Sequence, residues 1–221
     1  MIQTNLEIWL RVSQLNKEKF PLNFIVSEGR HSVVISFPQL KLALKIFKPN
    51  LTNNAMKEYK FLKELSKRGY NVPKPYSLII DEHPIIVREY IPGMHFKEFL
   101  NKADHEEIET VVMKLIKFIH RLDLESVFID ELSYPTKNII VTDELDVYII
   151  DFERATRTRS RSNVTQFLSF VYRVSMSTGP LKKKFEEIFD FSKIREVSTM
   201  YKKTKDLSFI LKIFKRKLKS V

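Results

Sequence analysis

The chain has 221 residues, of which 43% are hydrophobic and 29% charged, so it holds enough apolar material for one or two domains with a buried core. It contains no cysteine, which excludes disulfides, thiolate zinc sites and cysteine nucleophiles. No stretch approaches the roughly 18 apolar residues of a membrane-spanning helix, and the N-terminus lacks the pattern of a secretory signal. We therefore expect a cytoplasmic protein without a membrane partner.

The first part of the chain alternates short apolar runs with turns, which predicts a sheet-rich domain. Residues 1–22 precede it with the spacing of an amphipathic helix, which we interpret as an N-terminal extension. A helix is predicted over 52–67, with Thr52 or Asn53 as its N-cap and Gly69 just beyond its end. The predicted strands are residues 23–27, 32–37, 40–47, 76–80 and 84–89.

From residue 96 onward the apolar spacing becomes that of helices. The predicted elements are helices at 96–101 and 105–122, strands at 138–142 and 147–152, and further helices from 163 to the C-terminus. The segment Ile91-Pro92-Gly93 predicts a linker between the two patterns. The expected fold class is α+β, with a small five-stranded domain over 23–92 and a mostly helical domain over 93–221.

Lys45 is a cation inside the otherwise apolar run Leu42-Ala43-Leu44-Lys45-Ile46-Phe47. Burying it is costly unless it has a partner, and Glu58 on the following predicted helix could supply one. The alternative is an edge strand from which Lys45 faces water.

Gly29 lies in the turn between the first two predicted strands, followed closely by His31 and Ser32. Such a turn could lay backbone N–H groups over phosphates. An ordinary hairpin turn is the alternative.

Asn138 and Asp151 lie at the ends of two neighbouring predicted strands. An amide oxygen and a carboxylate are hard oxygen ligands suited to magnesium. Combined with a phosphate-binding lysine, they indicate a Mg-nucleotide site.

In their order, these parts resemble the protein-kinase-like superfamily. Most similar in appearance are the small archaeal-type predicted serine/threonine protein kinases, the RIO-type kinases and the small kinase of the tRNA threonylcarbamoyl-adenosine complex. The resemblance implies a bilobal kinase fold that uses ATP and Mg²⁺. It implies that Lys45, held by Glu58, contacts the α/β-phosphates, that Asn138 and Asp151 hold the metal, and that the backbone near Glu89 and Ile91 meets the adenine.

The catalytic loop departs from this pattern. The usual motif places an aspartate base five residues before the magnesium asparagine, but that position holds Ser133. Glu131, seven residues before Asn138, is therefore the candidate base, with Asp130 as the alternative. Glu153 replaces the glycine that usually follows the Asp-Phe pair.

The net charge of +11 is concentrated near the C-terminus, where residues 193–221 hold ten basic and two acidic side chains. A helix is predicted over 206–219, with an apolar stripe at Leu207, Ile210, Leu211 and Phe214. Its outward basic ridge could bind RNA or an acidic partner. The ridge consists of Lys212, Lys215, Arg216, Lys217 and Lys219.

Three functional hypotheses follow. The leading one is an atypical ATP- and Mg-dependent serine/threonine protein kinase that acts on a protein substrate, including itself. The alternatives are a kinase-fold ATPase that acts as a switch in an RNA-linked complex, and a pseudokinase binding module.

Overall fold

The computed structural model describes residues 23–215. The helix expected over 1–22 and the last part of the helix expected over 206–219 therefore lie outside the described residues. The chain divides into two compact units. The first extends to Pro92 and includes Ile150–Arg154, and the second comprises Gly93–Ile149 together with the chain from Ala155 onward.

The first unit contains a five-stranded antiparallel sheet with the order β1-β2-β3-β5-β4. A short 3-10 turn, η1 (Pro38–Leu40), joins the second and third strands, so the third strand begins later than the apolar pattern predicts. The strands are β1 (Ile25–Glu28), β2 (Ser32–Phe37), β3 (Leu42–Phe47), β4 (Pro75–Ile79) and β5 (Ile85–Glu89).

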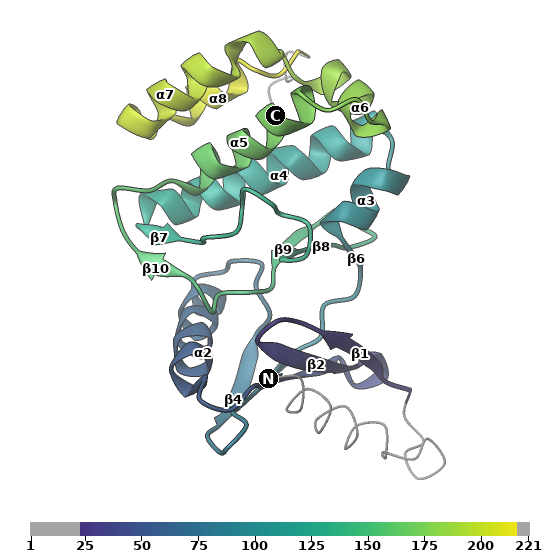
Figure 1. The fold of residues 1–221 in the computed structure, drawn as a ribbon, viewed down its shortest axis with the longest axis vertical. Helices are drawn as coiled ribbons and strands as arrows, with labels where there is room; N and C mark the ends of the chain where they lie inside the picture. Colours follow the sequence, from purple (N-terminus) through teal and green to yellow (C-terminus); the bar gives the residue numbers. More distant parts are fainter. Residues whose placement is uncertain (1–22, 216–221) are drawn as a thin grey trace. The chain divides into compact units, whose positions relative to one another are not determined.

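Strand β3 shows why one face of this sheet is buried. Ala43, Lys45 and Phe47 are buried, whereas Leu44 and Ile46 between them are only partly buried, as the two-residue period of a strand requires. On the buried face, Phe47 packs with Ala55 and Ile86. Ala55 belongs to helix α2 (Thr52–Lys67), which lies alongside the sheet (Figure 1).

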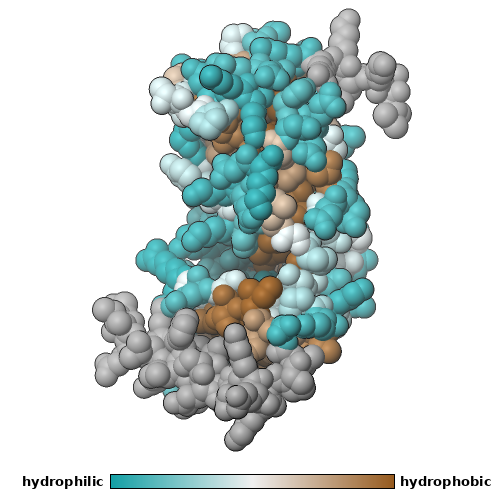
Figure 2. All heavy atoms as spheres, turned by 90° about the vertical axis from the view of Figure 1, so that its right-hand side faces the viewer, coloured by the Kyte–Doolittle hydropathy of each residue, from teal (hydrophilic) through white to brown (hydrophobic). Residues whose placement is uncertain are grey.

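The opposite face of the sheet carries a second hydrophobic cluster. Val33 and Ile35 form its buried part, and partly buried side chains from β1, β2 and β3 pack around them. Figure 2 shows hydrophobic surface on the β1–β2 side of this unit.

Helix α2 spans its predicted range, but its N-terminus differs from the prediction. Leu51 is the N-cap residue and makes no side-chain capping bond, so the prediction of Thr52 or Asn53 as the cap was wrong. At the other end, Gly69 has φ +72°, the left-handed conformation that commonly follows a helix.

The second unit is mostly helical. Its described helices are α3 (Phe96–Lys102), α4 (His105–Leu124), α5 (Asn163–Ser175), α6 (Pro180–Ile188), α7 (Ile194–Thr204) and α8 (Leu207–Leu211), with a 3-10 turn η2 (Phe191–Lys193). Helix α5 packs against α4, α6 and α7 (Figure 1). Asp104 caps α4 and forms a reciprocal capping box with Glu107.

Five short strands accompany these helices. Strands β8 (Ile139–Val141) and β9 (Val147–Ile149) were predicted, although with longer ranges. Strand β6 (Met94–His95) joins them in a three-stranded sheet, and β7 (Val127–Phe128) pairs with β10 (Thr156–Arg157). These last three have two residues each, too short to produce a recognisable alternation in the sequence.

The continuous helix predicted over 206–219 is wrong in its described part, because α8 ends at Leu211. Phe214 instead forms an antiparallel bridge with Phe189, and Ile213 is fully buried. Lys212 and Lys215 are exposed, whereas the other three residues of the predicted basic ridge lie outside the described residues. Between residues 23 and 215, no helix is both long and apolar enough to cross a membrane.

Candidate active site

Lys45 lies in the interior of the first unit. Strand β3 is the central strand of the sheet, and Lys45 is only 3% exposed, so the alternative of an edge strand with a solvated lysine is wrong. The Lys45 Nζ atom lies 2.6 Å from Glu58 Oε2 and 3.1 Å from Asp151 Oδ1. The structure therefore brings together three of the residues that the sequence assigned to the nucleotide site.

Glu58 is completely buried and binds a second cation besides Lys45. Its Oε1 atom accepts a hydrogen bond of 3.1 Å from Arg88 on β5. Arg88 is 5% exposed, and it also donates to the carbonyl oxygen of Ile150 at 2.6 Å. The sequence analysis did not single out Arg88, which ends the apolar run Ile85-Ile86-Val87 and is followed by Glu89, a weaker signal than Lys45 with apolar residues on both sides.

The ion pairs and their burial shift the pKa values of this group. Burial alone would lower the pKa of Lys45, but Glu58 and Asp151 together raise it above its ordinary value. Complete burial raises the pKa of Glu58 to about 7, against the opposing effect of Lys45 and Arg88. Burial would also raise the pKa of Asp151, but Lys45, the Glu153 backbone N–H and Arg88 together outweigh it and hold that pKa below the ordinary value. Asp151 therefore stays ionised at neutral pH, as a metal ligand must.

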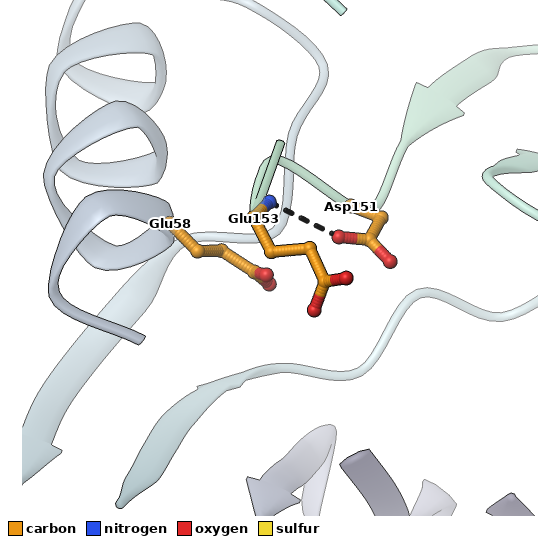
Figure 3. A group of neighbouring side chains, drawn as sticks. All are labelled: Glu58, Asp151 and Glu153. Atoms are coloured by element: carbon orange, nitrogen blue, oxygen red, sulfur yellow. Dashed lines mark hydrogen bonds between the residues drawn. The ribbon is translucent and has the colours of Figure 1, made fainter. Parts of the chain in front are cut away.

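Three carboxylates lie close together, and Figure 3 shows their side chains. One oxygen each of Glu58, Asp151 and Glu153 lies within 4.8 Å of the others. Lys45 and the backbone N–H of Glu153 both bind Oδ1 of Asp151, and no hydrogen bond from the described residues reaches its Oδ2. Both oxygens of Glu58 are bound by Lys45 and Arg88, whereas Asp151 presents an uncommitted hard oxygen of the kind that fits a magnesium ion.

The turn with Gly29 has the bonding of an ordinary hairpin. The Gly29 N–H donates to the Ser32 carbonyl oxygen at 2.8 Å, so this N–H is already used within the turn. The ring nitrogen Nδ1 of His31 lies 2.6 Å from Glu153 Oε1. Glu153, the partner of His31, is the residue that replaces the glycine of the usual Asp-Phe-Gly motif.

The segment expected to meet the adenine leaves β5. The N–H of Glu89 donates to the Lys74 carbonyl oxygen at 2.9 Å, while the Lys74 N–H turns to the Glu89 side chain. No hydrogen bond from the described residues involves the N–H of Ile91. Of the two residues predicted to meet the adenine, only Ile91 therefore has a backbone N–H that is not hydrogen-bonded within the described residues and could donate to the adenine ring.

The predicted catalytic loop belongs to the second unit. Asn138 donates from Nδ2 to Glu131 Oε2, which leaves the amide oxygen of Asn138 for a cation. Asp130, the alternative base, accepts instead from Arg161 at 3.1 Å. The geometry thus links Glu131, rather than Asp130, to the predicted metal ligand.

Helix α5 holds the longer loop between Glu131 and Asn138. Gln166 accepts a hydrogen bond from the Ser133 backbone N–H at 3.2 Å, and Arg173 donates to the Ser133 carbonyl oxygen. The Arg173 guanidinium also lies 4.1 Å from the ring centroid of Tyr134. Both peptide groups of Ser133 are therefore satisfied by α5, which explains how the additional residues keep one conformation.

Comparison with known proteins identifies the family. A sequence model of the RIO domain matches residues 46–170, more than half of the chain. The chain belongs to the RIO domain family. The match includes Glu58, Glu131, Asn138 and Asp151, and it begins one residue after Lys45. No curated protein matches this RIO-family chain.

Solved structures of other proteins have a similar fold. One is WbdD, in a co-crystal with a kinase inhibitor, with a TM-score of 0.54 and 16% identity over 80% of this chain and 44% of WbdD. Another is the aminoglycoside phosphotransferase APH(3'')-Id from Streptomyces rimosus, with a TM-score of 0.59 and 9% identity over 87% of this chain and 90% of the other. The chain spans less than half of WbdD. These likenesses show a kinase-like fold, in agreement with the RIO domain family.

Proposed function

We propose that this RIO-family protein is an ATP- and Mg²⁺-dependent kinase that transfers the γ-phosphoryl group to a serine or threonine hydroxyl of a protein, including its own. The observation that carries the proposal is the buried contact of Lys45 with Glu58 and Asp151. A cation next to an ionised carboxylate supports the proposal, because phosphates and their counter-ion require such a pair of charges.

In this mechanism Lys45 binds the α/β-phosphates, and Glu58 keeps its ammonium group in place. Glu131 accepts the proton of the substrate hydroxyl, whose oxygen then bonds to the γ-phosphorus while the bond from that phosphorus to the β–γ bridging oxygen breaks. Asp151 and Asn138 would hold Mg²⁺, which when bound supplies charge neutralisation on the β- and γ-phosphates. The assignment of Asn138 follows from the kinase resemblance.

The decisive assay follows labelled phosphate from ATP and separates protein-bound from free phosphate, with Mg²⁺ and with a chelator. We expect Mg²⁺-dependent label on serine or threonine. Glu131→Gln should lower turnover by about 10²- to 10⁴-fold, the usual contribution of a general base, with ATP affinity nearly unchanged. Asp130→Asn is the matched control and should keep near wild-type turnover, because its carboxylate binds Arg161.

Other outcomes identify the competing functions. Free phosphate without labelled protein would indicate an ATPase, and ATP binding without turnover would indicate a pseudokinase. A damaging Asp130→Asn would move the base by one residue. An RNA or acidic partner remains a proposal supported only by the exposed Lys212 and Lys215. It requires salt-sensitive RNA binding that weakens when both lysines are neutralised.

A further inference from the structure

Arg88 is a buried cation for which the kinase pattern has no role. Arg88 is 5% exposed and lies on β5, the strand next to β3. Ala43 and Arg88 are direct partners across β3 and β5, as are Lys45 and Ile86, so all four side chains lie on the face that packs with α2. A guanidinium buried there without partners would be strongly unfavourable. The hydrogen bonds that Arg88 makes are therefore what allows it to be buried, and they indicate its role.

Those bonds reach one partner of Lys45 directly, Glu58, and the residue that precedes the other, Asp151. Arg88 donates to Glu58 Oε1 at 3.1 Å, while Lys45 occupies the other oxygen, Oε2, at 2.6 Å. Arg88 also donates to the Ile150 carbonyl oxygen at 2.6 Å, one residue before Asp151. A single guanidinium thus joins helix α2 to the backbone that carries the metal-binding aspartate.

We propose that Arg88 is a positioning residue that fixes α2 to the sheet through Glu58, so that the pairing of Lys45 with Glu58 is assembled without an activation step. The proposal rests on the function proposed above for the role of Lys45 toward ATP. In protein kinases the corresponding lysine–glutamate pair must form for activity, and movement of the helix controls it. Here, displacement of α2 would leave both Lys45 and Arg88 without the Glu58 carboxylate in the interior, which opposes the displaced state.

Lysine cannot replace arginine in this role. Both bonds come from Nη1 of Arg88, whose two N–H groups lie in the rigid guanidinium plane and reach the Glu58 carboxylate and the Ile150 carbonyl oxygen together. A lysine ammonium is a point charge on a flexible four-carbon stem with a shorter total reach, so it would keep the charge but not both bonds. Arg88→Lys therefore separates charge from geometry.

The test compares Arg88→Met and Arg88→Lys with wild type, using Arg68→Met as a control at an arginine that is half exposed, just beyond the end of α2. Hydrogen exchange of the α2 amides reports on the helix without requiring activity. We expect Arg88→Met to raise exchange in α2 at least about tenfold while α4 keeps its wild-type rates, because only the pairing that holds α2 is lost. Arg88→Lys should lie between, and Arg68→Met should match wild type.

Enzyme kinetics provide a second test of the proposal. Arg88→Met should lower kcat and raise the KM for ATP, Arg88→Lys should recover part of both, and wild type should show linear progress curves from the first turnover. Unchanged α2 exchange in Arg88→Met would overturn the proposal, as would a wild-type lag that preincubation with ATP removes. If Arg88→Met does not fold, the comparison of Arg88→Lys with wild type decides by the same criteria. Failure of the wild-type protein to bind ATP would refute the proposed function instead. The hydrogen-exchange rates of α2 would still show whether Arg88 fixes this helix to the sheet.

Discussion

Replacing Lys45 with methionine tests the ion-pair arrangement most directly. The substitution keeps an unbranched side chain in β3 but removes the cation shared by Glu58 and Asp151. Breaking a buried ion pair by removing one partner typically costs about 3–5 kcal/mol. Glu58 keeps Arg88, and the Asp151 side chain is 29% exposed, so we expect the lower end, about 3 kcal/mol in the free energy of unfolding.

Lys45→Met should also weaken ATP binding. A lost hydrogen bond between charged groups contributes about 1.5–3 kcal/mol, which corresponds to roughly 10- to 100-fold in the dissociation constant for Mg-ATP. Isothermal titration calorimetry measures the affinity, and chemical denaturation followed by circular dichroism measures the stability. Lys60→Met, the same change at an exposed position of α2, should alter neither. Wild-type ATP affinity in Lys45→Met would show that the nucleotide site is misplaced, and unchanged stability would refute the energetic role of the ion pairs.

Three further predictions follow from other contacts. Gly93→Ala should destabilise the second unit by roughly 3 kcal/mol, because Gly93 has φ +140° and an added Cβ would lie 2.3 Å from the Val141 carbonyl oxygen; a denaturation midpoint within error of wild type would contradict this. Tyr201→Phe should cost about 1 kcal/mol in the same measurement, since the buried hydroxyl donates to Asp123 at 3.2 Å, and no loss would mean that this bond contributes nothing. The pKa of Asp151 is held below its ordinary value of 3.8, so its stabilising contribution is present above that pH and lost as the pH falls through the lower folded-state value. The difference in unfolding free energy between wild type and Asp151→Asn should therefore shrink as the pH falls below about 4, and a difference that does not shrink in this acid range would contradict the assigned direction.

Local sequence patterns predicted the elements whose signals lie within a short segment. Strands β2 and β3 are short, mostly apolar runs bounded by turns, and α2 ends where Gly69 can adopt a positive φ. The pairing of Lys45 with Glu58 was accessible for the same reason, because it joins a strand to the next helix over thirteen residues. In these cases the determinants are close in sequence.

Contacts between distant segments account for what the sequence did not reveal. Leu207, Ile210, Leu211 and Phe214 have helical spacing, yet the chain leaves the helix because Asp190 and Ile188 bond to the backbone of Ile213 and Lys215. The backbone pairing with this distant segment outweighs the local preference. Arg88 was missed for a related reason, since its partners lie 30 and 62 residues away.

The two parts of the proposed site are each held by contacts inside their own unit. In the first unit, Lys45 binds Glu58 and Asp151, and Arg88 on β5 binds Glu58 and the carbonyl oxygen of Ile150. In the second, Asn138 binds Glu131 while α5 fixes the loop through both peptide groups of Ser133. Positioning within a unit is a folding property, because the groups are ordered before any substrate arrives. Phosphoryl transfer depends mainly on such positioning and on charge, so the additional loop residues and the Glu131 carboxylate are compatible with catalysis despite their departure from the usual motif.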